Sequence, residues 1–287
     1  MHKKDKVFIQ RCIELAQKGL GNTYPNPLVG CVIVKNDEII AEGWHKKAGA
    51  AHAEVDAIQK VINKSILKEC TLFVNLEPCS HFGKTPPCTD LIIEMGIPNI
   101  VIGCQDSNEK VSGKGIKKLI EAGCNVITGV LEKKCQTMNQ RFFTFHEKKR
   151  PYIILKWAES KDGFMAPKNP EKDYWLTHPH SRQRVHQWRS EEQAILVGSQ
   201  TVLNDDPNLS TRLWFGKNPI RFAIDPNHRI PKKSNLNDGE ITTFFLVDEN
   251  SDRKSDNNII SAEKILESLY KKNIQSVIIE GGAKTLE

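Results

Sequence analysis

Apolar residues with helical spacing alternate with short apolar runs over residues 6 to about 145. This alternation is typical of a layered α/β domain. The pattern predicts helices at 7–20, 52–62, 88–96 and 114–123, and strands at 28–34, 37–45, 71–76, 99–104 and 125–130. The first two strands should form a hairpin with Asn36 and Asp37 at its turn. Strands that are joined through helices usually lie parallel in one sheet.

A second α/β pattern follows residues 144–151, TFHEKKRP, which are charged, end in proline and are predicted to be a linker. Strands are predicted at 151–158, 194–198, 219–225, 241–247 and 276–282, with helices at 181–193 and 262–272. A chain of 287 residues fits two domains, which we place at 1–146 and 147–287.

The last predicted strand runs into Gly281 and Gly282, and five residues follow them. A double glycine at this place normally opens a loop and a helix. We expect no room for that helix, so the second domain should be truncated at its C-terminus.

The composition is that of an ordinary soluble protein, with 39% hydrophobic and 26% charged residues. No apolar run approaches the ~18 residues of a membrane span, so a cytoplasmic protein that does not contact membranes is expected. The net charge of +6 is a mild surplus that fits anionic small molecules better than nucleic acid. Because thiols stay reduced in this setting, the closely spaced Cys79 and Cys88 are best explained as metal ligands.

The strongest chemical signal is His52-Ala-Glu54, followed by PCSHFGKTPPC at residues 78–88. A catalytic zinc needs three protein ligands and an open position for water, and His52, Cys79 and Cys88 supply the three. Zinc lowers the pKa of bound water towards ~7, which makes hydroxide available to attack a ring carbon bearing an amino group. Glu54 would be the general acid/base and not a ligand.

Two further expectations concern the sulfur ligands. Cys79 should begin a helix, where the positive end of the helix dipole favours a thiolate. A purely structural zinc would need a fourth protein ligand, which His81 could supply.

Three segments carry a resemblance: TYPNPLVGCVIV at 23–34, GWHKKAGAAHAE at 43–54 and the eight-residue loop between Cys79 and Cys88. They resemble the riboflavin-biosynthesis deaminases of the cytidine-deaminase-like superfamily, which form the first half of a bifunctional deaminase-reductase. The resemblance implies a three-layer α/β/α domain with one Zn²⁺ per chain. It also implies hydrolytic deamination of 2,5-diamino-6-(5-phosphoribosylamino)pyrimidin-4-one to 5-amino-6-(5-phosphoribosylamino)uracil. The positions that would bind this substrate are Asn26, His45, His81, Lys84, Asp106 and Asn108.

The second half resembles the reductase of the same family, a dihydrofolate-reductase-like α/β domain that uses NADPH. The segments that carry this resemblance are KWAESKDG at 156–163, DYWLT at 173–177 and IIEGGAKTL at 278–286. The implied reaction is hydride transfer to the ribosyl group, giving a ribityl chain, with Asp205 assisting proton transfer. Positions that would face NADPH are Ala158, Trp175, Thr201, Asp205, Gly281 and Gly282, and those that would face the substrate are Asp173, Arg189, Leu209, Arg212 and Glu280. Truncation would weaken or abolish reduction and leave an apolar face partly exposed.

Two other functions remain open. The first is a nucleoside, nucleotide or tRNA deaminase with an appended non-reductase domain, against which the absence of a short P-C-x-x-C argues. The second is a non-catalytic binding module stabilised by zinc. A homo-oligomer is expected by analogy with other domains of these folds, and nucleic acid is not an expected partner.

Replacing Glu54 by alanine separates an enzyme from a binding module. We expect Glu54→Ala to lose nearly all turnover and to retain zinc, because a general acid/base is not a metal ligand. Ammonia release and zinc content per chain measure the two effects. Unchanged function in this variant would favour the binding module.

Overall fold

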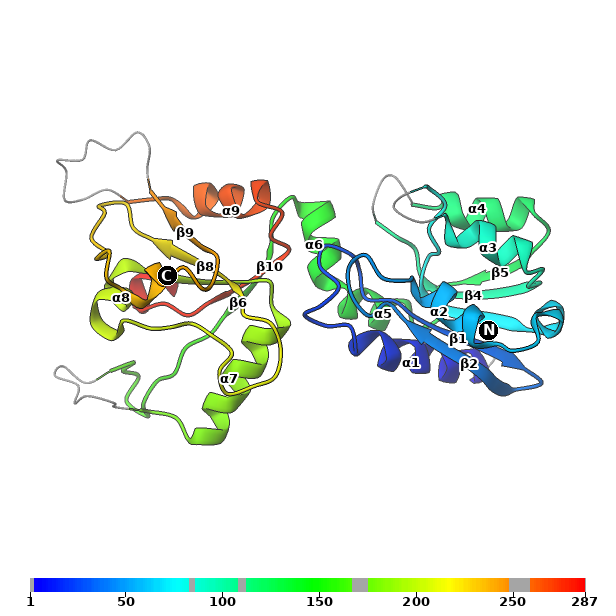
Figure 1. Cartoon of the computed structure of the whole chain (residues 1–287), viewed down its shortest axis with the longest axis horizontal. Coiled ribbons are helices and arrows are strands. Elements are labelled where there is room, and N and C mark those ends of the chain that lie inside the picture. The colour runs from blue at the N-terminus through cyan, green and yellow to red at the C-terminus, as the bar shows by residue number, and fades with distance from the viewer. Residues whose placement is uncertain (1–2, 83–85, 108–111, 167–174, 248–258, 287) are drawn as a thin grey trace. The chain divides into compact units, whose positions relative to one another are not determined.

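The computed structural model describes residues 3–82, 86–107, 112–166, 175–247 and 259–286. The chain divides into two compact units, Met1–Lys148 and Lys149–Glu287. Each unit has a five-stranded sheet of its own, with helices on both faces (Figure 1). The α/β class predicted from the apolar pattern is therefore confirmed for both halves.

The first unit has the sheet order β2-β1-β3-β4-β5, in which β3, β4 and β5 are parallel and β1 is antiparallel to both of its neighbours. Asn36 and Asp37 form the β1–β2 turn with positive φ angles of 49° and 65°. The elements are α1 (Lys3–Gln17), β1 (Gly30–Lys35), β2 (Glu38–Trp44), α2 (Ala53–Lys60), a 3-10 helix (Lys64–Glu69), β3 (Thr71–Leu76), α3 (Cys88–Glu94), β4 (Asn99–Cys104), α4 (Lys114–Glu121), β5 (Asn125–Thr128), α5 (Glu132–Met138) and α6 (Gln140–Lys148).

Alternation of side chains along the strands builds the two cores of this unit. Cys31 and Ile33 of β1 pack on the side of α2, α3 and α4. Val32 and Val34 point to the opposite side, where they pack with residues of α1, α5 and α6. Figure 1 shows α3 and α4 on one face of the sheet and α1 on the other.

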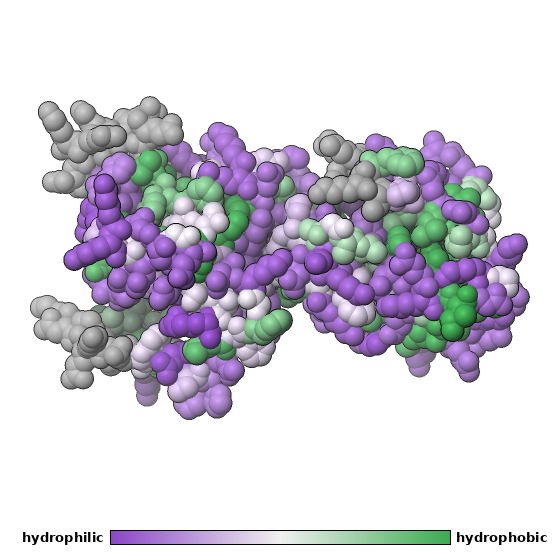
Figure 2. Space-filling model, in the orientation of Figure 1, coloured by the Kyte–Doolittle hydropathy of each residue, from purple (hydrophilic) through white to green (hydrophobic). Residues whose placement is uncertain are grey.

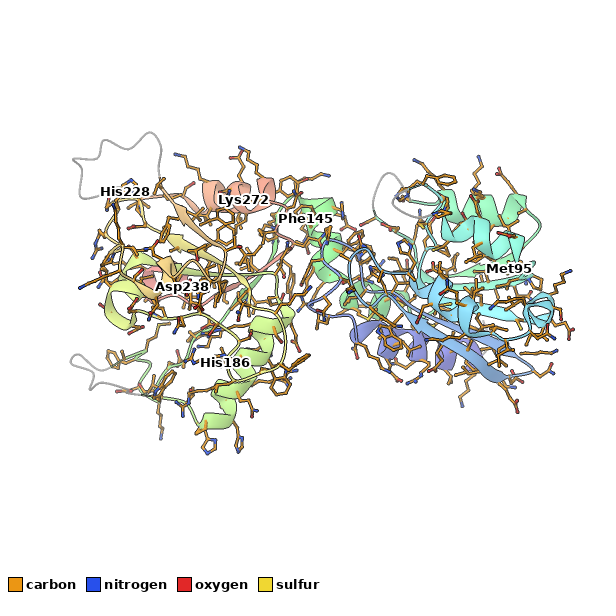
Figure 3. All side chains as sticks on the ribbon, in the orientation of Figure 1. Met95, Phe145, His186, His228, Asp238 and Lys272 are labelled. Atoms are coloured by element: carbon orange, nitrogen blue, oxygen red, sulfur yellow. The ribbon has the colours of Figure 1, made fainter. Side chains whose placement is uncertain are left out.

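The prediction of a linker at 144–151 is wrong for residues 144–148, because α6 continues to Lys148. Phe142, Phe143 and Phe145 of this helix are buried, while the charged residues at its end are mostly exposed. Burial of these aromatic side chains stabilises the helix. The charged residues near its end concealed it in the sequence pattern. Phe145 is seen on α6 in Figure 3.

All five strands of the second unit are parallel, in the order β6-β10-β7-β8-β9. One core, around Leu196 and Phe222, includes Leu269 of α9, and the other, around Ile195 and Ala223, includes Val202 of α8. The elements are β6 (Tyr152–Leu155), α7 (Pro179–Glu191), β7 (Ala194–Gly198), α8 (Ser199–Asp205), β8 (Ile220–Ile224), a 3-10 helix (Asn235–Asn237), β9 (Thr243–Leu246), α9 (Ala262–Lys271), β10 (Ser276–Ile279) and α10 (Ala283–Leu286).

The expectation that no helix follows the double glycine is also wrong, because α10 begins directly after Gly282. Thr285 donates its backbone N–H to the carbonyl of Gly282 at 2.9 Å, closing the first turn. A Cβ on Gly281 would lie 2.4 Å from Cβ of Thr285, so the turn packs against its own glycine. One helical turn therefore fits into four residues.

The second unit leaves apolar side chains accessible along its edges. Residues of the edge strands β6 and β9 are mostly half-buried, and Leu155 is exposed. Trp214 and Phe215 are exposed in the loop before β8. On the face drawn in Figure 2, hydrophobic residues are interspersed among hydrophilic ones. No helix within the described ranges has the length and apolar character needed to cross a membrane.

Strand β2 lies very close to the backbone of α2 at Gly43. A Cβ on Gly43 would lie 2.4 Å from both the Ala53 carbonyl oxygen and the Ala57 backbone nitrogen. Gly43→Ala should push α2 away from the sheet and lower the free energy of unfolding by about 1–3 kcal/mol, as overpacking usually does. Urea unfolding of this variant, compared with Glu38→Ala on the exposed start of β2, measures the effect. Equal stability of the two variants would contradict it.

Candidate active site

His52, Cys79 and Cys88 converge from three separate segments of the first unit. His52 is the N-cap of α2, Cys79 follows the end of β3, and Cys88 is the first residue of α3. Their ligand atoms all lie within 4.8 Å of one another. Nδ1 of His52 is 3.3 Å from Sγ of Cys88 and 3.5 Å from Sγ of Cys79.

This triangle of donor atoms has the dimensions of a zinc site. Zinc binds histidine nitrogen at about 2.0–2.1 Å and thiolate sulfur at about 2.3 Å, so tetrahedral ligands of the two kinds lie about 3.6 Å apart. The two nitrogen–sulfur distances are close to this value. The cluster offers three candidate ligands among the described residues, so a tetrahedral ion bound there would have a fourth position open to water.

The helix start contributes to this site differently from the prediction, because Cys79 precedes α3 and Cys88 begins it. The first backbone N–H of the helix, at Cys88, donates to Sγ of Cys79 at 3.3 Å. The pKa of the Cys79 thiol is lowered, first by the hydrogen bond with Cys88 and then by that with His52. The pKa of Cys88 is raised by the same hydrogen bond and by burial. Cys79 is therefore the sulfur that ionises first.

Glu54 lies beside the sulfur atoms in the first turn of α2. Its side chain is 3% exposed. Burial, together with the charge of Cys79, raises its pKa to about 7. A carboxyl group with this pKa can take up and release a proton near neutral pH, which is the property a general acid/base needs.

Asn26 and His45 form a second polar group next to the ligand cluster. Nδ1 of His45 lies 3.0 Å from the Ala51 carbonyl, so this nitrogen carries the proton. Nε2 therefore accepts from the side-chain amide of Asn26, at 3.0 Å. The ring of His45 packs edge-on against the ring of His52 with centroids 5.5 Å apart. Burial lowers the pKa of His45, which keeps the ring neutral.

Two buried asparagines hold the backbone that leads to Asn26. Asn139 accepts from the N–H of Leu28 at 2.8 Å and donates to its carbonyl at 2.9 Å. Asn75 donates to the same carbonyl at 3.0 Å and accepts from the N–H of Gly30 at 2.7 Å. Neither asparagine was predicted from the sequence. The available signal was a polar residue within the apolar run of β3.

The remaining predicted residues of the first unit are only partly placed. His81 is exposed and is not a member of the ligand cluster. Asp106 is buried, and its backbone N–H donates to the Glu77 carboxylate at 3.2 Å. Lys84 and Asn108 lie outside the described residues.

In the second unit, Arg189 and Glu280 form a two-pronged ion pair. Nε and Nη2 of Arg189 donate to the two carboxylate oxygens at 2.9 and 2.8 Å. Lys156 lies 3.7 Å from the same carboxylate, and Arg189 also donates to the Ser210 carbonyl at 3.1 Å. Leu209, just before that carbonyl, is buried with a φ of +51°, a conformation that costs energy for a residue other than glycine. Three of the predicted substrate residues, Arg189, Glu280 and Leu209, therefore lie in this ion pair or next to a backbone carbonyl that it contacts.

The residues predicted to face NADPH are more scattered. Gly282 donates its N–H to Oγ1 of Thr201 at 3.1 Å, so the segments after β7 and β10 meet there. Trp175 is exposed and stacks with the Arg182 guanidinium, 4.5 Å from the ring centroid. Of the other residues predicted to face NADPH, Ala158 and Gly281 are half-buried and Asp205 is exposed. Of the residues predicted to face the substrate, Arg212 is exposed and Asp173 lies outside the described residues.

His186 is a buried residue of this centre that the sequence did not suggest. It stands one turn before Arg189 on α7 and is 4% exposed (Figure 3). Burial, with the charges of Arg189 and Arg212, lowers its pKa to about 4. Within the part of the chain that the structure describes, no group hydrogen-bonds its Nδ1. The signal that could have revealed it is its i, i+3 spacing with Arg189 on the same helix.

Two family models match the chain. Residues 2–104 match the cytidine and deoxycytidylate deaminase zinc-binding region, and residues 151–287 match the RibD C-terminal domain. The riboflavin biosynthesis protein RibD of Aquifex aeolicus (strain VF5) is 40% identical over 98% of this chain and 82% of its own length. This chain belongs to the RibD family. RibD of Bacillus amyloliquefaciens is also 40% identical, over 97% of this chain and 79% of its own length.

Solved structures give the same result. The diaminohydroxyphosphoribosylaminopyrimidine deaminase/5-amino-6-(5-phosphoribosylamino)uracil reductase of Thermotoga maritima has a TM-score of 0.89 and 42% identity, covering 98% of this chain and 82% of its own. RibD of Acinetobacter baumannii has a TM-score of 0.88 and 35% identity, covering 99% and 82%. This chain thus spans about four-fifths of the length of its RibD relatives. Because residues 151–287 match the RibD domain, a deaminase with an unrelated appended domain is not favoured.

The lowered pKa of His186 predicts a pH-dependent stability. A folded-state pKa of about 4, against 6.5 for the free side chain, means that the unfolded chain binds the proton first as pH falls. His186 should therefore lower the free energy of unfolding of the second unit by about 1–2 kcal/mol between pH 7.5 and pH 5. His186→Gln should lose this component.

Tryptophan fluorescence during urea unfolding follows this effect, because Trp157, Trp175, Trp188 and Trp214 belong to the second unit. The matched control is His180→Gln, at an exposed position of α7. The same pH dependence in wild type and His186→Gln would refute the assignment.

Proposed function

We propose that this chain catalyses two successive steps of riboflavin biosynthesis. The first is deamination of 2,5-diamino-6-(5-phosphoribosylamino)pyrimidin-4-one in residues 1–146. The second is NADPH-dependent reduction of the resulting aminouracil in residues 147–287. The observation that carries the proposal is the triangle of His52, Cys79 and Cys88 beside a buried Glu54, in a chain of the RibD family.

In the deaminase site, the zinc ion supplies an acidified water when it is bound. Glu54, whose pKa is about 7, would act as the general acid/base that takes up a proton and delivers one to the departing amine. Asn26, held by the Nε2 lone pair of His45, presents its amide to the heterocycle. The uncharged His45 would add no cation beside the metal. His81, Lys84, Asp106 and Asn108 complete the proposed substrate contacts.

In the reductase site, NADPH supplies a hydride to C1′ of the ribosyl group when it is bound. The segments after β7 and β10 suit a dinucleotide, because ligands of open parallel sheets bind at the carboxyl ends of the strands. Gly281, Gly282 and Thr201 lie there, and a Cβ on Gly282 would meet only Oγ1 of Thr201, at 3.8 Å. Trp175, Ala158 and Asp205 are the other proposed contacts of the cofactor, and Asp205 the proposed proton donor.

The proposed substrate contacts in the reductase are Arg189, Arg212, Glu280, Leu209 and Asp173. Glu280 already pairs with Arg189 through both oxygens, so this arginine is held in one orientation before substrate binds. The exposed Arg212 is the better candidate for a phosphate, since its guanidinium is accessible. We further propose a cytoplasmic homo-oligomer that binds small molecules and no nucleic acid.

The proposal is tested by one assay with two readings on purified protein. Ammonia release from the diaminopyrimidine substrate and loss of NADPH absorbance are followed together. Wild type should give both signals. Cys88→Ser should lose zinc and reduce ammonia release by about a hundredfold or more, since a metal ligand is removed. When supplied with the deaminated product, it should still oxidise NADPH.

Cys124→Ser is the matched control, because Cys124 is half-buried and far in sequence from the ligand cluster. Ammonia release without NADPH oxidation by the wild type would support deamination and overturn the proposed reduction. Full ammonia release from zinc-free protein would overturn the proposed zinc chemistry.

A further inference from the structure

Glu77 is a buried carboxylate that the deaminase chemistry does not use. It directly follows β3 and lies two residues before Cys79, with 4% of its surface exposed. Four backbone N–H groups donate to it. Oε1 accepts from Gly115 at 2.9 Å and Ile116 at 3.2 Å. Oε2 accepts from Gly113 at 3.0 Å and Asp106 at 3.2 Å.

These four donors lie on the far side of β4 in the sequence from Glu77. Gly115 and Ile116 are in the first turn of α4, where backbone N–H groups have no partner within the helix. The N-cap, Gly113, has a φ of +73° and no side chain with which to cap the turn. Glu77 therefore caps α4 from another segment, and its negative charge suits the positive end of the helix.

A second, independent observation ties the same segments together. A Cβ on Gly115 would lie 2.2 Å from the carbonyl oxygen of Pro78. The first turn of α4 therefore lies directly against the backbone that joins Glu77 to Cys79. The α4 turn cannot move relative to this backbone without breaking the contact, and Asp106 is attached to the same carboxylate.

We propose that Glu77 is a positioning residue of the deaminase, which fixes Asp106 and the start of α4 relative to the Cys79 segment. Glu77 touches neither the reacting carbon nor the metal, and it acts through the backbone of Asp106. The inference rests on the proposed function, in which Asp106 is one of the substrate contacts away from the reacting carbon. It also assigns the N–H groups of Gly115 and Ile116 to Glu77, so these two groups are not available to a phosphate.

Glu77→Gln is the sharpest variant. The amide replaces one acceptor oxygen by an NH₂ group, which would face two N–H donors and repel them. We expect KM for the diaminopyrimidine substrate to rise about tenfold and kcat to change by less than about threefold, because substrate contact is lost away from the reacting centre. Zinc content should stay at one per chain. A merely structural role would lower the amount of active enzyme and leave KM unchanged.

A double-mutant cycle with Asp106→Ala tests the route of the effect. If Glu77 acts through Asp106, Glu77→Gln should add little to the KM of Asp106→Ala. Independent, multiplying effects on KM would overturn the proposal, and so would loss of zinc in Glu77→Gln. Glu121→Gln, an exposed glutamate at the other end of α4, is the matched control and should keep wild-type kinetics.

Amide hydrogen exchange measured by NMR gives a reading that does not depend on activity. The N–H groups of Gly115 and Ile116 should be protected in wild type, although first-turn amides normally exchange freely. Exchange at both should be about tenfold faster in Glu77→Gln. Unprotected amides in wild type would overturn the proposal even in an active enzyme. Protected amides in a protein that releases no ammonia would instead refute only the proposed function.

Gly115→Ala approaches the same contact from the other side if Glu77→Gln does not fold. Its methyl group must displace either Pro78 or the first turn of α4. The expected results are the same rise in KM and the same faster exchange. An unchanged KM in a folded Gly115→Ala would overturn the proposal.

Discussion

A tetrahedral metal site requires its donor atoms to be placed to within about 0.2 Å, and the segments that carry His52, Cys79 and Cys88 hold these side chains together in a cluster of the size of such a site. The three donors come from the starts of two helices and the loop after a central strand. Hydrogen bonds then hold the loop after β3 in place on two sides. Glu77 accepts from N–H groups at the start of α4, and the Cys88 N–H donates to Sγ of Cys79. Gly43 and Gly115 let α2 and α4 approach neighbouring backbone closely enough to complete this arrangement.

The convergence of His52, Cys79 and Cys88 and the positions of the strands were predictable, because residue type and local spacing define them. The runs 71–76 and 99–104 coincide with β3 and β4. The hydrogen-bond partners within the two sites were not predictable in this way. Asn139 bonds to a residue 111 positions away, and Arg189 to one 91 positions away. Such partners depend on how the chain folds back, which no local pattern contains. Helix α6 was missed because its charged end disguised three buried phenylalanines.

In the second unit, a buried carboxylate lies at the centre of the candidate site. Glu280 is paired with Arg189 and lies near Lys156, so cations surround the acid. Desolvation opposes the charge of Glu280, yet the Arg189 hydrogen bonds and the cationic charges around it leave its pKa lowered. A buried pair of this kind is costly to break, because the partner left behind keeps its charge without compensation. The strained backbone at Leu209 and the uncharged His186 both adjoin this pair.

The two sulfur ligands are also joined by backbone contacts that do not involve the residues between them. Besides the N–H bond from Cys88 to the Cys79 sulfur, the N–H of Thr89 donates to the Cys79 carbonyl at 3.2 Å. The ends of the intervening segment are thus fastened independently of its length. Closing a longer loop costs little extra free energy, about 0.6 kcal/mol for each doubling. The segment between the two cysteines can therefore change in length or composition while Cys79 and Cys88 keep the same spacing.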